Sequence, residues 1–129
     1  MRLILTLLLW AGLVLQASAL QVEVKPTLTN AGSNQVGTEV LAKGFTTATI
    51  HVCCVFNATI TFKASIDGTN FEPLGCVPAE SQSALVSSTT IRGLWRCNII
   101  GFTQIRADLT NYVSGVINVN IGLTAAGVS

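Results

Sequence analysis

A strict alternation of apolar and polar residues constrains the fold of this chain more than any other feature of its sequence. In residues 58–66 every second side chain is apolar, with Ile60, Phe62, Ala64 and Ile66 set against Thr59, Thr61, Lys63 and Ser65. Successive side chains of a β-strand point to opposite faces, so this pattern predicts a strand with one buried face. Asp67 and Gly68 follow at once and predict a hairpin turn, because glycine tolerates a positive φ and aspartate hydrogen-bonds its own backbone.

The same pattern recurs along the chain at intervals of about 8 to 12 residues, without a helical period. In residues 45–56 it places Cys54 on the buried face, and His51 and Cys53 on the outer face. Pro26 is expected to end the first strand, because it cannot donate to a ladder. The predicted strands are residues 22–25, 45–56, 58–66, 71–78, 85–91, 94–100, 103–112 and 115–123. The sequence therefore predicts an all-β fold, a single antiparallel β-sandwich of jelly-roll or immunoglobulin-like type with about seven or eight strands.

The first twenty residues differ from the rest and have the pattern of a targeting segment. Arg2 precedes an apolar stretch, residues 3–15, and the small residues Ala17, Ser18 and Ala19 form a signal-peptidase cleavage pattern. We therefore predict a hydrophobic signal helix in residues 1–19 that is removed on export. The mature part is then one domain, residues 20–129, in a secreted or periplasmic location. The alternative is a retained membrane anchor, because the apolar stretch approaches the roughly 17 residues that can span a bilayer.

The few charges exclude some classes of partner. Charged residues make up 10% of the chain, against about 25% in typical soluble domains. The chain has 7 basic and 6 acidic residues, and since Arg2 belongs to the leader, the mature part is neutral. Nucleic-acid binding and attachment to a membrane surface both require clustered basic residues, so neither is expected. A neutral, sparsely charged surface favours association with other protein chains or with copies of itself.

The four cysteines all lie in the mature part, and an exported chain with an even number of cysteines is typically disulfide-bonded. Three connectivities are open. Cys76 with Cys97 is the pairing we favour, because both sit mid-strand among apolar neighbours, and Cys54 with Cys97 is the alternative. Cys53 and Cys54 are not expected to pair with each other, because adjacent strand residues point to opposite faces. Zinc is not expected, because the spacing lacks a CxxC pair and His51 is the single histidine.

Side chains with catalytic potential are few and scattered. His51 is the one candidate base, and a lone histidine on the outer face of a strand is usually a solvated side chain. A glycosidase-like pair needs two carboxyl groups about 5 to 9.5 Å apart. Asp67 is expected to serve its turn, and Asp108 to lie on the polar face of a strand. We therefore expect neither enzymatic activity nor a cofactor.

Three segments together resemble a known family. ATITFKASIDGTNF in residues 58–71, GLWRCNIIGF in residues 93–102 and IRADLTNYVSGVINV in residues 105–119 follow one another in order. They are similar to a β-sandwich module found in structural proteins of tailed bacteriophages and prophages, often associated with tails or fibres. The resemblance implies a structural role for the shared residues, and virion association if the chain is phage-encoded. A secreted relative encoded by a prophage or a cell is equally compatible with the predicted leader.

We therefore expect a non-enzymatic structural or assembly module that packs against copies of itself or a fibre or virion partner. The alternative is a secreted glycan-binding adhesin of the same fold. Trp95 and Tyr112 are the candidate surface contacts, because aromatic rings can stack on sugars or on a protein partner. An uncovered long edge strand would favour assembly, and an exposed groove lined by either aromatic residue would favour the adhesin.

Overall fold

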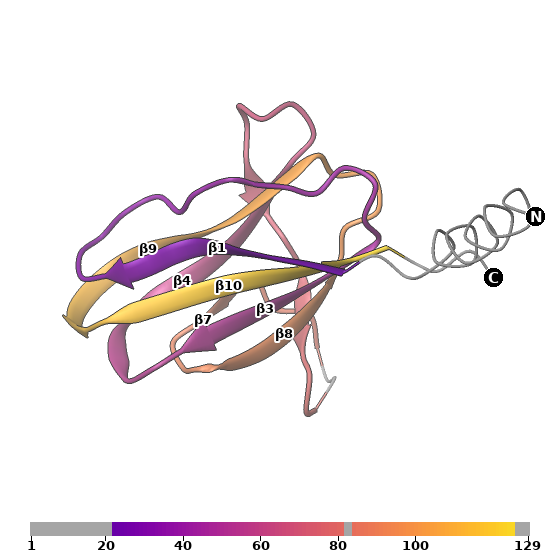
Figure 1. Ribbon diagram of the computed structural model, residues 1–129. Helices are drawn as coiled ribbons and strands as arrows, with labels where there is room; N and C mark the ends of the chain where they lie inside the picture. Colours follow the sequence, from indigo (N-terminus) through magenta and orange to yellow (C-terminus); the bar gives the residue numbers. More distant parts are fainter. Residues whose placement is uncertain (1–21, 82–83, 126–129) are drawn as a thin grey trace, which may run out of the picture.

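The computed structural model describes residues 22–81 and 84–125 (Figure 1). These residues form ten strands and no helix, and the predicted signal segment, residues 1–19, lies outside them. The strands are β1 (Val22–Ala31), β2 (Val40–Leu41), β3 (Thr47–Cys53), β4 (Phe56–Ser65), β5 (Glu72–Pro73), β6 (Cys76–Pro78), β7 (Ser88–Thr89), β8 (Gly93–Asn98), β9 (Gln104–Gly115) and β10 (Ile117–Thr124). The expected number of seven or eight strands is too low, because the two-residue strand β2 shows no alternating pattern and the predicted strand 71–78 is divided into β5 and β6.

The strands form two antiparallel five-stranded sheets. Sheet A has the order β1-β10-β3-β8-β6, and sheet B has the order β2-β9-β4-β5 with β7 also paired to β4. In Figure 1, β10 (yellow) lies between β1 (indigo) and β3, with β9 and β4 behind them. Both sheets are built from strands that are far apart in sequence, so neither forms from local hairpins alone.

One apolar core lies between the two sheets, in a sandwich-like arrangement. The alternation predicts most of its members correctly, because Ile60 and Phe62 of β4 and Ile50 of β3 are fully buried. The expectation that Ile66 lies on the buried face is wrong, because β4 ends at Ser65 and Ile66 is 71% exposed. Trp95 of β8 is 5% exposed, and its ring lies 5.7 Å from that of Phe62, centroid to centroid. This contact joins sheet A to sheet B at the centre of the core.

The predicted hairpin after β4 is present. Gly68 has a φ of 77°, and the carboxylate of Asp67 accepts hydrogen bonds from the backbone N–H groups of Asn70 and Thr69 at 2.8 and 2.9 Å. These bonds to Asn70 and Thr69 hold the pKa of Asp67 well below its usual range, since they stabilise the charged form. The carboxylate is therefore committed to the turn.

The first strand is longer than predicted. It continues through Pro26 to Ala31, with register shifts against β10 after Pro26 and after Leu28. The expectation that Pro26 ends the strand is wrong because β1 is the last strand of sheet A, and a proline without an N–H is tolerated on such an edge.

The predicted strand 45–56 is two strands. β3 ends at Cys53, and β4 begins at Phe56. Cys54 between them has a φ of 94°, a left-handed conformation that an extended strand does not allow. Cys54 is therefore half-buried in a turn, not on the core face of a strand.

Cys76 and Cys97 are opposite each other in the register of β6 and β8 and form a disulfide with an S–S distance of 2.04 Å. Their exposures are 0% and 1%. The bond ties β6, the outermost strand of sheet A on that side, to the neighbouring strand. It is the pairing that the sequence favours.

Charges gather on the outer face of sheet B, around Asp108. Arg106 Nε donates to Asp108 Oδ1 at 3.0 Å, and Lys63 Nζ lies 3.5 Å from Asp108 Oδ2. The backbone N–H of Gly37 donates to the same Oδ1 at 3.1 Å, so the carboxylate also fastens the segment before β2 to β9. Asp108 is 6% exposed, so its carboxylate is a buried acceptor for these groups and not a solvent-exposed side chain of the strand.

Replacing Asp108 by alanine should lower the free energy of unfolding by about 2 kcal/mol, because charge-assisted hydrogen bonds and a buried backbone donor lose their acceptor. Urea denaturation followed by circular dichroism measures this change. Glu72→Ala is the control, because this exposed carboxylate has no ion pair in the described part of the chain. Equal, small effects of the two substitutions would contradict the role of Asp108.

Candidate functional site

The outer faces of the two sheets differ in charge. Sheet B carries the Asp108 cluster, whereas the three central strands of sheet A contain one charged side chain, Arg96. Their outward residues are mostly threonines and asparagines in direct cross-strand register: Thr47, Thr49, His51, Cys53, Leu94, Arg96, Asn98, Asn118, Asn120, Gly122 and Thr124. Sheet A thus presents a polar face with one charge, Arg96, on its three central strands.

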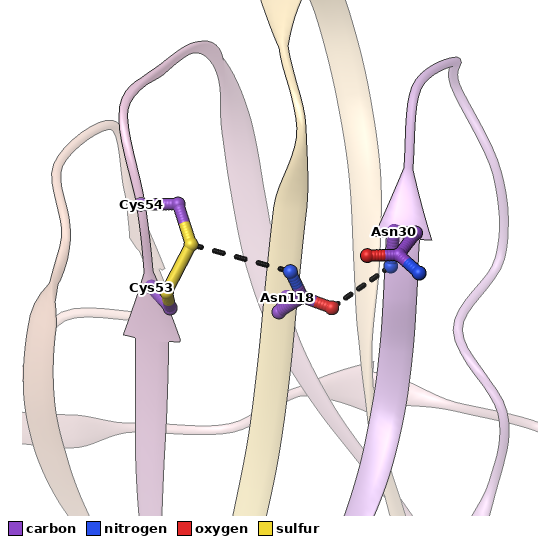
Figure 2. The surroundings of a disulfide bond; sticks show 4 residues. All are labelled: Asn30, Cys53, Cys54 and Asn118. Carbon is purple, nitrogen blue, oxygen red and sulfur yellow. Dashed lines mark hydrogen bonds between the residues drawn. A yellow bond between two sulfur atoms is a disulfide. The ribbon is translucent and has the colours of Figure 1, made fainter.

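At one end of this face, Cys53 and Cys54 form a disulfide between adjacent residues, with an S–S distance of 2.08 Å (Figure 2). The expectation that these two cysteines do not pair is wrong. It assumed a continuous strand, whereas β3 stops at Cys53 and the positive φ of Cys54 brings both sulfur atoms to the same side.

An asparagine of β10 holds the disulfide in place, as Figure 2 shows. The side-chain amide of Asn118 donates to Cys54 Sγ at 4.0 Å, and its Oδ1 accepts the backbone N–H of Asn30 at 2.9 Å. Asn118 lies on β10, the strand between β1 and β3, and its side chain therefore connects the end of β3 to β1. Asn118 thereby links the disulfide to sheet A.

A pocket of about 490 Å³ opens beside the disulfide. The segments that form it are the end of β3, the start of β8 and the chain just after β6. Its lining residues are His51, Val52, Cys53, Cys54, Ala79, Glu80, Arg92, Gly93 and Leu94. Its size falls within the range of about 300–1,000 Å³ that is usual for small-molecule sites.

Three polar side chains of the pocket are free to bind. Within residues 22–81 and 84–125, Arg92, Glu80 and His51 form no ion pair and no side-chain hydrogen bond. His51 lies exposed on the outer face of β3, as expected, with Leu94 of β8 directly opposite. The pocket therefore combines an unpaired cation, an unpaired carboxylate and an imidazole.

Neither predicted aromatic contact lies in this pocket. Trp95 is buried, because the alternation in β8 turns it inward between Leu94 and Arg96, so the expectation of a Trp95 surface contact is wrong. Tyr112 is half-buried, and its hydroxyl donates to the Gly115 carbonyl oxygen at 2.7 Å. Tyr112 thereby stabilises the irregular end of β9.

Sequence reasoning missed Arg92, Glu80 and the paired cysteines as site residues. Arg92 and Glu80 lie in connecting segments without a motif, and only the fold brings them to the end of β3. The adjacency of Cys53 and Cys54 was the one signal available. A turn placed at Cys54, instead of a continuous strand, would have brought the two sulfur atoms together.

A second feature is the free edge of sheet A. Residues 22–26 of β1 are all exposed, with Val22 and Val24 each 65% exposed, and no described strand lies beyond them. The later part of β1 is covered, because the Thr27 carbonyl oxygen accepts the backbone N–H of Thr38 at 2.7 Å. Residues 22–26 therefore have no strand neighbour on their free side, although Pro26 has no N–H to donate and residues 38–41 lie close by.

No described helix is long and apolar enough to span a membrane. The described residues also contain no cluster of three or more histidine, cysteine, aspartate or glutamate residues that could hold a metal ion.

Comparisons with known proteins show similarity at the level of structure alone. No protein-family model matches the chain, and no curated protein sequence matches it. The crystal structure of the SPBc2 prophage-derived protein YomS superposes with a TM-score of 0.76 and 18% identity, over 83% of this chain and 96% of YomS. The shared property is the fold.

A second solved structure has the same fold within a larger chain. The PBSX exported protein XepA superposes with a TM-score of 0.77 and 18% identity, over 83% of this chain but 39% of XepA. A periplasmic inhibitor of g-type lysozyme, PliG from Aeromonas hydrophila, superposes with a TM-score of 0.43 and is too different to support an argument. The chain thus has the same fold as a prophage-derived protein.

Proposed function

We propose that this protein is a non-enzymatic assembly module, phage-related and exported, that associates with a second copy through strand β1. The observation that carries the proposal is the open edge formed by residues 22–26. Unpaired strand edges are templates for pairing with another chain. Lys25, a residue type that opposes such pairing, meets Glu23 of the other copy in the register described below. YomS is prophage-derived and XepA is an exported protein, and these properties support the phage-related and exported parts of the proposal. A place in a virion, tail or fibre is the role we propose for the assembled form.

The charges of the edge are complementary to themselves. In an antiparallel pair of β1 strands centred on Val24, Glu23 of each copy stands opposite Lys25 of the other, and Val22 stands opposite Pro26. Opposite charges that face each other across two strands stabilise the pair, and like charges destabilise it. Neither Glu23 nor Lys25 has an ion-pair partner in the described part of the chain, so both are available.

The register predicts the outcome of a charge-reversal experiment. Glu23→Lys or Lys25→Glu alone creates two repulsive pairs per dimer, and each should weaken dimerisation about tenfold, since surface ion pairs contribute up to about 1 kcal/mol each. The double variant Glu23→Lys with Lys25→Glu restores both attractions and should recover the original affinity. Size-exclusion chromatography with light scattering over a concentration series measures the three dissociation constants.

Glu72→Lys is the matched control for Glu23→Lys, because it makes the same change in net charge on an exposed residue of sheet B. It should leave dimerisation unchanged. A monomer at millimolar concentration would contradict the assembly function itself. Dimers that respond equally to all four variants would contradict pairing through β1.

A glycan-binding role based on Trp95 has no support in the geometry, because the indole is in the core. The Tyr112 hydroxyl is engaged with the Gly115 carbonyl oxygen. Recognition of sugars therefore requires other residues.

A further inference from the structure

We propose that the pocket beside the Cys53–Cys54 disulfide binds an acidic sugar residue, whose carboxylate pairs with Arg92. The pocket contains no residue of β1, so this proposal does not depend on the proposed assembly through that strand. It assigns a ligand-binding function to the outer face of sheet A.

The inner surface of the pocket suits the apolar face of a sugar ring. The disulfide between adjacent residues closes a compact ring whose sulfur atoms are polarisable and apolar in character. Leu94, 47% exposed, lies beside it, and Ala79 adds a short side chain. Since the Asn118 amide donates to Cys54 Sγ, this apolar surface is held in position before a ligand arrives.

The polar groups define the rest of the ligand. Arg92 is the one cation among the lining residues, and its planar guanidinium matches a carboxylate in a two-point contact. Glu80 accepts hydrogen bonds from hydroxyl groups, and the imidazole of His51 can donate or accept. A ligand that satisfies all three groups carries one carboxylate and several hydroxyls on a ring with an apolar face, which describes an acidic sugar.

Glucuronate and glucose form a matched pair of probes, because they differ only in the carboxylate at C6. Titration of each sugar into the isotopically labelled protein should shift the NMR signals of the Leu94 methyl groups and the Cys53 amide. We expect glucuronate to bind about fivefold more tightly than glucose, because ion pairs at exposed sites contribute up to about 1 kcal/mol. Equal affinities for the two sugars would overturn the proposal.

Arg92→Gln isolates the proposed contact. Because Arg92 is exposed, this substitution should remove the preference for glucuronate and leave glucose binding unchanged. A general disturbance of the structure would weaken the binding of both sugars. Arg96→Gln is the control, because Arg96 is an exposed arginine on the same face but outside the pocket, and it should keep the preference. Loss of the preference in both variants would point to general charge attraction and overturn the assignment.

A second variant tests the apolar surface. Replacing Cys53 and Cys54 together by serine should weaken the binding of both sugars by a similar factor, because both sugar rings lose the same contact.

L-Alanine, which has a carboxylate and an ammonium group but no hydroxyl, tests the competing ligand class. Tighter binding of alanine than of glucuronate would show that Arg92 and Glu80 recognise a zwitterion, and would overturn the sugar assignment.

Discussion

Replacing Phe62 by alanine should lower the free energy of unfolding by about 3–5 kcal/mol, the usual cost of deleting a buried aromatic ring. Phe62 is fully buried and meets Trp95 of the opposite sheet at 5.7 Å, so the cavity would lie where the two sheets contact each other. Urea denaturation followed by far-UV circular dichroism measures the loss without relying on the fluorescence of Trp95.

Phe71→Ala is the control for this experiment. Phe71 is half-buried on the outer face of sheet B, where the Arg106 guanidinium carbon lies 3.9 Å from its ring centroid. The same deletion should cost about 1 kcal/mol there, because one side of the ring already faces water. A loss below 1 kcal/mol for Phe62→Ala would contradict the face-to-face packing of the sheets.

Replacing Cys76 and Cys97 together by alanine should lower the free energy of unfolding by about 3 kcal/mol in the chain-entropy treatment of disulfides. The bond joins residues 21 apart, so its removal restores considerable freedom to the unfolded chain. The free energy is measured by chemical denaturation of the double variant and of the original protein, both without reductant.

The second disulfide of the chain is a matched control. Cys53 and Cys54 are neighbours in sequence, so their bond encloses no intervening residue and limits the unfolded chain very little. Replacing both by alanine should therefore change the stability by much less than replacing Cys76 and Cys97. Similar losses for the two double variants would mean that the effect arises from cysteine packing and not from closing a loop.

The long strands of the fold could be predicted from sequence because each buries one face. The alternation around Phe62 identified β4 and its inward residues, and the Asp67-Gly68 turn followed from the chemistry of the two residues. Edge strands lack this signal, which is why the continuation of β1 past Pro26 and the two-residue β2 were missed. Their position depends on pairing with distant strands.

The pocket was beyond prediction for a related reason. Its polar groups come from three separate segments, and Arg92 and Glu80 lie outside regular strands. Their meeting point is set by the order of strands in sheet A, which alternation does not determine. The buried position of Trp95, in contrast, followed from its place between Leu94 and Arg96 and could have been inferred from the alternation of that strand.

The position of the pocket on the outer face of sheet A has a consequence for any dimer formed through β1. Two antiparallel β1 strands would extend sheet A into one continuous sheet, and the symmetry axis would run perpendicular to it. Both copies of His51 and Leu94, which point outward from the same sheet, would then be on one side of the dimer. A polymer with repeated acidic sugars could engage both sites at once, and such bivalent attachment can exceed the affinity of one site by about 10²–10⁴-fold. Weak binding of a single sugar would thereby become tight binding to a surface that carries many such sugars.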